Sequence, residues 1–359
     1  MRILVITFRN IGDVLLSSPL LSNLRYHYPD AVIDYVLNDY CEDMIKYNPD
    51  VNNFYSYNRS YVKKLNRVDM FFDELRFLRS ILKSHYDVVI NLTEGMRGDC
   101  IAFLSSSKIK IGFSGKKKSF VKKFFLNHIV DIKYMHMVEN KLLPLQCLNK
   151  EVVTKKVSLY WSNSDQENVD KLLVSYDLNG KDFVHIHPVA RWMFKAWSAE
   201  SFANVIDHIE NCCGKKVILT SSDDMIEKNE IYKILALCES KPINLAGQLS
   251  LTSLACLSSK AAFFIGVDSA PMHMAAAVNI PVIALFGNSD ALLWGPWSND
   301  GINSSYNDSG RSQINGKHHV IQYEKGMIIS NNGIKLSSSM NKILPRDVKN
   351  IVDQYMQVI

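Results

Sequence analysis

The residues most able to do chemistry follow short apolar runs of the chain. Asp268 and Ser269 come directly after the run 263–267, and His273 lies four residues beyond Ser269. A helix that opens at Pro271 would point free N–H groups and the positive end of its dipole out of this turn. Such a corner favours an anion, for example a phosphate. The structural alternative is that Asp268 and Ser269 only cap the helix and that His273 is a core histidine.

A second carboxylate and a lysine stand in similar places. Asp13 follows the apolar run 3–8 and a turn in which Gly12 would allow a sharp change of direction. It is a candidate general base, or merely the cap of the next helix. Lys195 lies in a loop of cations and aromatic residues, after the run 183–187. A lysine there could neutralise the charge of a departing phosphate.

Strands and helices that alternate along the chain would position these side chains. Such alternation predicts an α/β fold whose parallel sheets carry helices on both faces. Ligands bind such sheets at the carboxyl ends of the strands. Strands are predicted at 3–8, 31–37, 53–57, 86–92, 183–187, 216–220, 243–245, 263–267 and 281–286, and helices at 14–28, 69–84, 198–209, 251–258, 272–278 and 345–356.

The length of 359 residues predicts two domains rather than one. We place the first at 1–160 and the second at 161–344, with a terminal helix at 345–359. Within the second domain, the segment 300–340 is rich in Asn, Ser and Gly and shows little periodicity. It is expected to form surface loops or a weak hairpin.

Composition narrows the class of protein. The net charge of +5 permits an anionic partner without requiring nucleic acid, and none is expected. Seven cysteines without a CxxC pair predict a reduced, cytoplasmic protein that has no structural zinc site. No apolar stretch is long and uncharged enough to span a bilayer, so any membrane contact should be peripheral.

The most basic part of the chain is the run 105–123. It contains no acidic residue, has four phenylalanines in or beside it, and carries seven lysines: Lys108, Lys110, Lys116, Lys117, Lys118, Lys122 and Lys123. Such a run is often a solvated loop. The alternative is a patch that binds an anionic acceptor or a lipid surface.

Three segments in order resemble glycosyltransferase family 9, the ADP-heptose:lipopolysaccharide heptosyltransferases of Gram-negative bacteria. They are RNIGDVLLSSP (9–19), HPVARWMFKAW (187–197) and FIGVDSAPMHMAAAVNIPVIALFG (264–287). The pattern VDSAP…H, with LWGPWSN (293–299), is most similar to the heptosyltransferase III type, which adds the branch heptose of the inner core.

The resemblance implies a GT-B fold, with two Rossmann-like doubly wound domains facing a cleft, and an inverting mechanism without metal or cofactor. By motif, Asp13 would be the general base and Lys195 would stabilise the departing diphosphate, while Asp268 would hold sugar hydroxyls. ADP-heptose would be the donor, and the inner core of lipopolysaccharide the acceptor. Two further sets would complete the site: Ser269, Ala270, Pro271, Met272, His273 and Arg191 for the donor, and Arg9, Gly12, Lys116, Lys117 and Lys118 for the acceptor.

Two other functions fit the sequence less fully. A relative could use another sugar nucleotide or another core acceptor with the same residues. A non-catalytic sugar-nucleotide-binding protein would need Lys195 and the Asp268 corner but not Asp13. A dehydrogenase is disfavoured because no GxGxxG follows the first strand.

Overall fold

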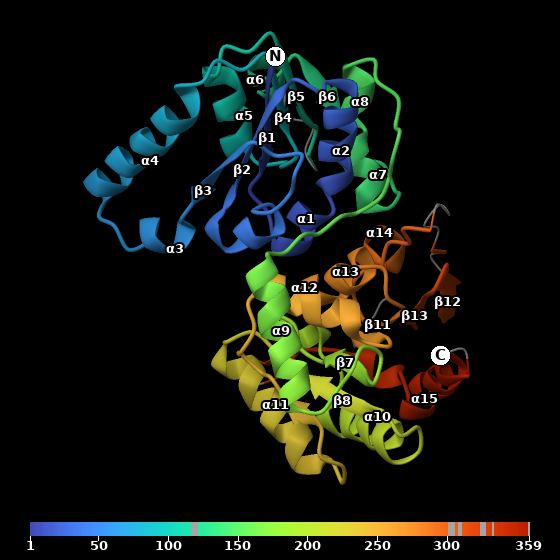
Figure 1. Cartoon of the computed structure of the whole chain (residues 1–359). Helices are drawn as coiled ribbons and strands as arrows, with labels where there is room; N and C mark the ends of the chain where they lie inside the picture. Colours follow the sequence, from blue (N-terminus) through green and yellow to red (C-terminus); the bar gives the residue numbers. More distant parts are fainter. Residues whose placement is uncertain (116–120, 301–305, 308–310, 324–327, 332–333, 358–359) are drawn as a thin grey trace. The chain divides into compact units, whose positions relative to one another are not determined.

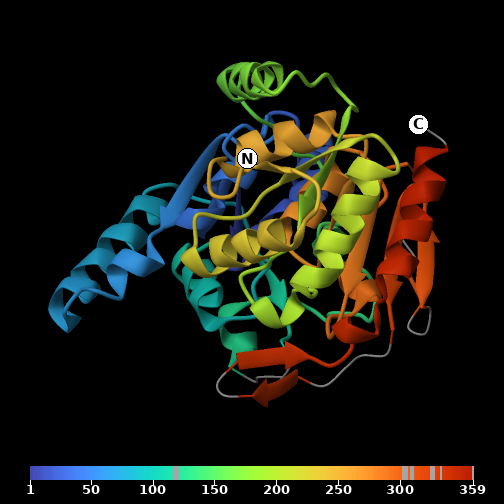
Figure 2. The same cartoon turned by 90° about the horizontal axis from the view of Figure 1, so that it is seen from below.

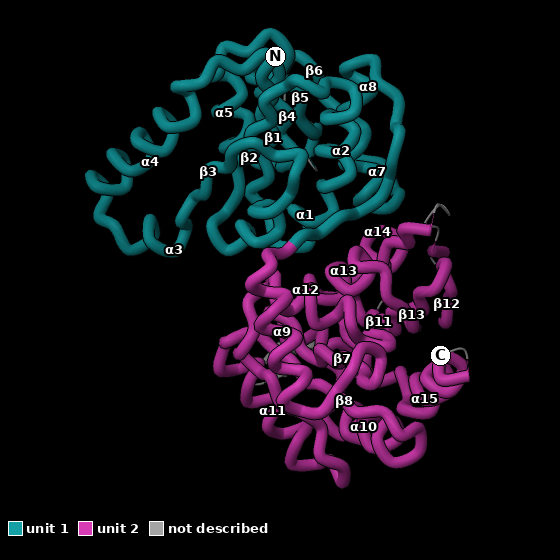
Figure 3. Tube along the Cα trace, viewed as in Figure 1, with its two compact units in different colours: residues 1–160 teal, residues 161–359 magenta. Residues whose placement is uncertain are grey.

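Two compact units make up the chain, Met1–Tyr160 and Trp161–Ile359 (Figure 3). The computed structural model describes residues 1–115, 121–300, 306–307, 311–323, 328–331 and 334–357. Within that part of the chain, no helix is both long and apolar enough to cross a bilayer.

Unit 1 is built on a six-stranded parallel sheet in the order β3-β2-β1-β4-β5-β6. Helices α2, α7 and α8 lie on one side of it, and α4 and α5 on the other (Figure 1). The strands are β1 (Arg2–Thr7), β2 (Val32–Asn38), β3 (Asn53–Tyr57), β4 (Val88–Asn91), β5 (Ile109–Phe113) and β6 (His128–Val130). The helices are α1 (Ile11–Leu15), α2 (Ser18–His27), α3 (Arg59–Val62), α4 (Arg67–Leu82), α5 (Met96–Leu104), α6 (Lys122–Phe125), α7 (Met137–Leu142) and α8 (Pro144–Cys147), with a 3₁₀ turn η1 (Asp39–Met44).

Unit 2 contains a seven-stranded sheet in the order β12-β13-β11-β10-β7-β8-β9, parallel except for β12, and a separate hairpin β14–β15. One apolar core lies under α10, α11 and α15, and a second under α9, α12 and α13. The strands are β7 (Phe183–His187), β8 (Lys216–Leu219), β9 (Ile243–Asn244), β10 (Phe264–Val267), β11 (Val282–Phe286), β12 (Ser312–Asn315), β13 (His318–Gln322), β14 (Ile328–Asn331) and β15 (Ile334–Ser337). The helices are α9 (Asn163–Ser175), α10 (Ala199–Asn211), α11 (Met225–Leu237), α12 (Leu251–Lys260), α13 (Ala270–Ala277), α14 (Ala291–Trp294) and α15 (Pro345–Met356), with 3₁₀ turns η2 (Met193–Lys195) and η3 (Met340–Lys342).

Each main sheet reverses its strand order at one place, between β1 and β4 in unit 1 and between β7 and β10 in unit 2. The first strand of each unit lies in the middle of its sheet because chain connections run outward from it in both directions. Loops that leave adjacent strands at such a switch point diverge, and ligands bind there. The predicted α/β class with two doubly wound sheets is confirmed.

The sequence predicted most strands of the two main sheets, and three elements have the predicted bounds. The strands at 53–57 and 183–187 and the helix at 345–356 have the predicted bounds. The predicted helix at 14–28 is instead two helices, α1 and α2. Pro19 explains the break, because its ring prevents the preceding turn from continuing as one regular helix.

Two predictions about polar segments were wrong in part. The segment 300–340 does contain a separate hairpin, β14–β15, as expected, but its β12 and β13 extend the main sheet, and every residue of β13 is buried. Its polar sequence, HHVIQ, hid a strand because three of the five buried side chains are histidine or glutamine. The basic run 105–123 is not one loop either, because it contains the strand β5, in which Ile111, Gly112 and Phe113 are buried.

Candidate functional site

The loops that leave β7 and β10 meet at the switch point of unit 2. Lys195, at the end of η2, forms an ion pair through its Nζ with Asp268 Oδ2, and the same Nζ donates to the Asp268 carbonyl oxygen at 3.3 Å. Both side chains are largely buried, 17% and 8% exposed. Lys195 Nζ also lies 5.4 Å from the centre of the Trp192 ring. The predicted lysine and aspartate are therefore brought together.

Helix α13 begins directly beside this ion pair. Ser269 occupies its N-cap position, but its side chain makes no capping hydrogen bond. The Ser269 Oγ is buried and has no hydrogen-bond partner among the described residues. The interpretation that Asp268 and Ser269 only cap the helix is therefore wrong. The Asp268 side chain pairs with Lys195, and the Ser269 hydroxyl can still donate and accept a hydrogen bond beside the first turn of α13.

The other predicted donor residues divide by exposure. Ala270 and Pro271 form the opening positions of α13, where backbone N–H groups lack helical partners. The Met272 side chain is fully buried in the core under α9, α12 and α13, so it cannot face a ligand there. His273 is 5% exposed, with its ring 6.4 Å from that of Trp294. Arg191 is exposed, in the same loop as Lys195.

A chain of buried polar side chains supports this corner from within the sheet. His187 Nδ1 and His185 Nε2 lie 2.9 Å and 2.8 Å from the hydroxyl of Thr220, and His185 Nδ1 lies 2.9 Å from Ser258 Oγ. Burial lowers the pKa of His187 to about 3 and the pKa of His185 well below its ordinary value. Both imidazoles are therefore neutral at neutral pH.

Asp13 lies at the switch point of unit 1, in the first turn of α1. Its Oδ1 is 3.6 Å from the Nζ of Lys141, a side chain on α7 that is only 2% exposed. The N-cap residue of α1 is Asn10, so the capping interpretation of Asp13 is wrong. Burial lowers the pKa of Lys141, an effect that Asp13 opposes and Arg9 reinforces. A buried cation thus fixes the carboxylate where β1 ends.

Arg9 and Glu94 complete this corner. Arg9 Nη2 and Glu94 Oε1 lie 2.9 Å apart and join the loops after β1 and β4. The Arg9 carbonyl accepts hydrogen bonds from Asn38 Nδ2 at 3.0 Å and Tyr40 Oη at 3.2 Å, which hold the turn in place. Gly12 is the second residue of α1, a conformation open to any residue. The expectation that the turn needs glycine for a sharp change of direction is therefore wrong.

The basic run provides fewer surface cations than predicted. Lys122 is 4% exposed, its Nζ lies 3.2 Å from Asp99 Oδ2, and it donates to the Phe113 carbonyl at 2.6 Å. Lys108 and Lys123 are exposed. Lys116, Lys117 and Lys118 lie outside the described residues.

Sequence reasoning missed Lys141 and Glu94. A signal for Lys141 was present, because α7 and α8 carry apolar residues at Val138, Leu142 and Leu145, and the lysine falls on the same helical face. A lone cation on an apolar face needs a buried partner. Nothing local distinguished Glu94, since its role depends on the adjacency of β1 and β4.

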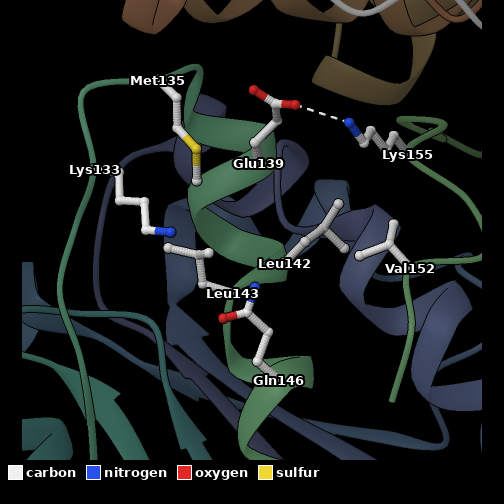
Figure 4. A pocket seen from close by; sticks show the side chains of 8 residues that line it. All are labelled: Lys133, Met135, Glu139, Leu142, Leu143, Gln146, Val152 and Lys155. Atoms are coloured by element: carbon white, nitrogen blue, oxygen red, sulfur yellow. Dashed lines mark hydrogen bonds and ion pairs between the residues drawn. The ribbon is translucent and has the colours of Figure 1, made fainter. Parts of the chain in front are cut away.

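A pocket of about 250 Å³ opens beside α7, lined by Lys133, Met135, Glu139, Leu142, Leu143, Gln146, Val152 and Lys155 (Figure 4). A charged contact across it joins Glu139 and Lys155 at 2.8 Å. None of the predicted site residues lines it.

Among the described residues, one group could offer three metal ligands: His208, Cys213 and Asp353. His208 Nε2 and Asp353 Oδ1 lie 2.7 Å apart and join α10 to α15. Burial raises the pKa of the Cys213 thiol, and Asp353 adds to the shift. The thiol form that results is a poor metal ligand, and the cluster contains none of the predicted site residues.

Comparisons with known proteins agree on one family. The model of "Glycosyltransferase family 9 (heptosyltransferase)" matches residues 74–319. Lipopolysaccharide heptosyltransferase 3 of Escherichia coli is 33% identical over 294 residues, which cover 81% of this chain and 85% of that protein.

Two solved structures share the fold across nearly the whole chain. The family 9 glycosyl transferase of Veillonella parvula has a TM-score of 0.80 and 21% identity, covering 100% of this chain and 98% of its own. The E. coli ADP-heptose lipopolysaccharide heptosyltransferase II has a TM-score of 0.74 and 20% identity, covering 99% of each chain. With its two doubly wound units of the GT-B fold, the chain belongs to glycosyltransferase family 9, the heptosyltransferases.

Proposed function

We propose that this protein is an inverting transferase that moves heptose from ADP-heptose to the inner core of lipopolysaccharide, of the heptosyltransferase III type that adds the branch heptose. The observation that carries the substrate class is the 33% identity to lipopolysaccharide heptosyltransferase 3 over 81% of the chain. The chemistry is supported by the polar groups gathered at the two switch points.

In this proposal, unit 2 (residues 161–359) binds the donor. The first turn of α13 offers backbone N–H groups, and the Ser269 hydroxyl is buried beside them without a partner among the described residues. Both features suit the diphosphate of ADP-heptose. Lys195 would contribute the cation, and Asp268 would accept hydrogen bonds from heptose hydroxyls. Arg191 and His273 would line the same cradle, with backbone contacts at 270–272.

In this proposal, heptose transfer uses Asp13, Lys195 and the first turn of α13. The acceptor hydroxyl gives its proton to the Asp13 carboxylate while its oxygen bonds to the anomeric carbon of heptose. The bond from that carbon to the ADP oxygen breaks, and ADP leaves with the electron pair. Lys195 and the first turn of α13 stabilise the charge that develops on the diphosphate. Attack opposite the leaving group inverts the anomeric configuration.

Unit 1 (residues 1–160) presents the base and binds the acceptor. Lys141 is a positioning residue because it fixes the Asp13 carboxylate without solvent access of its own. Arg9 and Gly12 lie in the same turn and would contact acceptor oxygens. We infer that Lys116, Lys117 and Lys118 add charge attraction to the anionic core and to the inner-membrane surface. The exposed Lys108 and Lys123, which flank them in sequence, support this part of the proposal.

The reaction is tested with purified protein, ADP-heptose and lipopolysaccharide cores truncated at successive sugars, and the products are read by mass. We expect one added heptose on a core that lacks only the branch heptose, with activity unchanged by EDTA. Transfer from a different sugar nucleotide, and none from ADP-heptose, would instead indicate a relative with another donor. Binding of ADP-heptose without any product would indicate a non-catalytic binding protein.

A further inference from the structure

The outer face of α4 is an apolar stripe that points to solvent. Four large side chains recur at helical spacing on it: Val68, Phe71, Phe72 and Leu75, which are 63%, 60%, 58% and 44% exposed. Positions i, i+3, i+4 and i+7 share one side of a helix. In most surface helices such a stripe faces the core, whereas these four residues, called here the outer face of α4, are uncovered.

The opposite side of α4 already holds the helix in place. Ile81 is fully buried, and Phe77 packs against Tyr57 with the ring centres 5.2 Å apart. Glu74 pairs with Arg97, whose guanidinium lies 3.3 Å from the centre of the Tyr57 ring. These contacts attach α4 beside the edge strand β3, and the helix projects from unit 1 in two perpendicular views (Figures 1 and 2). The outer face is therefore not needed for folding.

Basic residues surround the outer face. The segment 59–83 carries seven basic and three acidic residues, a net charge of +4. The acids are engaged locally: Asp69 accepts from the Asn66 amide at 2.7 Å, Asp73 lies 3.5 Å from Arg76, and Glu74 pairs with Arg97. Lys63, Lys64, Arg67, Arg76 and Arg79 are exposed.

We propose that the outer face of α4 docks on an anionic lipid bilayer, with Phe71 and Phe72 inserted below the headgroups. Interfacial helices combine an apolar stripe with flanking Lys and Arg in this way. The arginine stems can lie along the acyl boundary while their guanidinium groups reach lipid phosphates. This inference does not depend on the sugar-transfer reaction proposed above.

Charge decides against a second copy of the chain as the occupant. A symmetric dimer through the outer face would place the same patch on both subunits, with two segments of net charge +4 opposite each other. Those charges repel. An anionic bilayer instead offers apolar depth and charge of the opposite sign at the same surface.

The test is co-sedimentation of the full chain with vesicles of phosphatidylethanolamine and phosphatidylglycerol, and with vesicles of phosphatidylcholine alone. Wild type should bind the anionic vesicles, less so at high salt because exposed charges are screened. The double variant Phe71→Ser, Phe72→Ser should lose roughly tenfold or more of its partition coefficient. Lys63→Gln with Lys64→Gln should weaken the salt dependence.

A matched control is the double variant Met225→Ser, Ile226→Ser. These neighbours on α11 of unit 2 are 61% and 65% exposed, comparable with Phe71 and Phe72. The Met225/Ile226 variant should bind anionic vesicles as tightly as wild type does. If the Phe71/Phe72 variant binds anionic vesicles as tightly as wild type, or the control loses as much, the proposal is wrong.

Hydrogen exchange on the unmodified chain gives an independent reading. Anionic vesicles should slow exchange across α4, and phosphatidylcholine vesicles should not. Unchanged exchange across α4 with bound vesicles would overturn the proposal. So would a lipid-free dimer, seen by analytical ultracentrifugation, that the Phe71/Phe72 variant cannot form, because the outer face would then be an interface between copies.

Discussion

The carboxylate of Asp268 holds the ammonium group of Lys195 beside the first turn of α13. A diphosphate that binds at this turn competes with the carboxylate for the lysine. In the proposed function, Lys195 would exchange the Asp268 carboxylate for the diphosphate within the same corner. The released Asp268 carboxylate would then accept hydrogen bonds from the sugar hydroxyls.

Replacement of Lys195 tests this exchange. We expect Lys195→Ala to weaken ADP binding by roughly 10- to 100-fold, the effect of losing one charge-assisted hydrogen bond, and also to lower turnover. Lys195→Arg should retain part of both, since it keeps the charge. Calorimetry with ADP and the rate of heptose transfer provide the measurements. Magnesium that restored either property of the Ala variant would contradict the assigned role.

Lys141 is the second residue whose role depends on a buried ion pair. Lys141→Met keeps the volume but removes the cation, so the Asp13 carboxylate loses its fixed orientation. We expect roughly 10- to 100-fold slower transfer, since misplaced reacting groups cost about this much, with ADP affinity unchanged. A variant that transfers heptose at the wild-type rate but melts at a lower temperature would show that Lys141 only supports the fold.

The pH dependence separates the two roles of Lys141. The groups that face its ammonium are Asp13, Arg9 and Glu94, and its pKa is lowered from the ordinary value of 10.5, chiefly by burial. The cation is therefore lost at a lower pH than for an exposed lysine, and the alkaline limb of kcat/KM should begin below pH 10.5. Lys141→Arg should move this limb upward, because a guanidinium stays protonated.

At the scale of elements, the close approach of β7 and β10 brings together the loops that carry Lys195 and Asp268. Gly266 in β10 faces β7, where an added Cβ would lie 2.8 Å from the His187 carbonyl oxygen and 2.6 Å from the Phe264 ring. Backbone cannot yield easily at that point. The glycine therefore allows the Lys195 loop and Asp268 to meet.

We expect Gly266→Ala to lower the free energy of unfolding by about 1–3 kcal/mol, as overpacking does. It should also weaken ADP binding, because the two loops move apart. Thermal melts and calorimetry measure the two effects. As a control, Gly214→Asn changes a glycine of positive φ whose added Cβ would meet nothing within 4 Å, and ADP binding should be unaffected. Wild-type ADP affinity in the Gly266 variant would contradict this account.

Sequence predicted these elements where one apolar run made one buried strand, as in β7 and β10. It failed for β13, because its polar residues are buried only through pairing with the neighbouring strands β11 and β12. Local turns and motifs also singled out Asp13, Lys195 and Asp268, which lie at the two switch points, each in an ion pair. Lys141 and Glu94 depend on contacts between distant segments, and no local pattern encodes such contacts fully.

At the scale of the whole molecule, stability should fall in mild acid. Burial lowers the folded-state pKa values of four histidines, His185, His187, His318 and His319, from an unfolded value of 6.5, to about 3 for His187 and about 4 for His318. The unfolded chain therefore binds more protons than the folded chain below pH 6.5. The free energy of unfolding should be level above that pH and fall as the pH drops toward 3, by roughly 1.4 kcal/mol per pH unit for each histidine.

Denaturant unfolding at about pH 7, 6 and 5 measures this slope, because these values span the titration range of histidine and lie above most carboxyl pKa values. His187→Gln should make it shallower, because one of the histidines whose pKa is lowered by burial is removed, while His185, His318 and His319 remain. His85→Gln, at an exposed position of unit 1, serves as the control and should leave the slope unchanged. An equally steep slope in the His187 variant would mean that other groups carry the acid sensitivity.

The central claim of the proposed function is that Asp13 in unit 1 acts as the base and that the leaving diphosphate binds in unit 2. The most direct measurement is heptose transfer by Asp13→Asn at saturating ADP-heptose, with ADP affinity determined in parallel. The account predicts turnover lower by roughly two to four orders of magnitude, the range for a lost general base, with ADP affinity unchanged. Near-normal turnover in this variant would contradict the account.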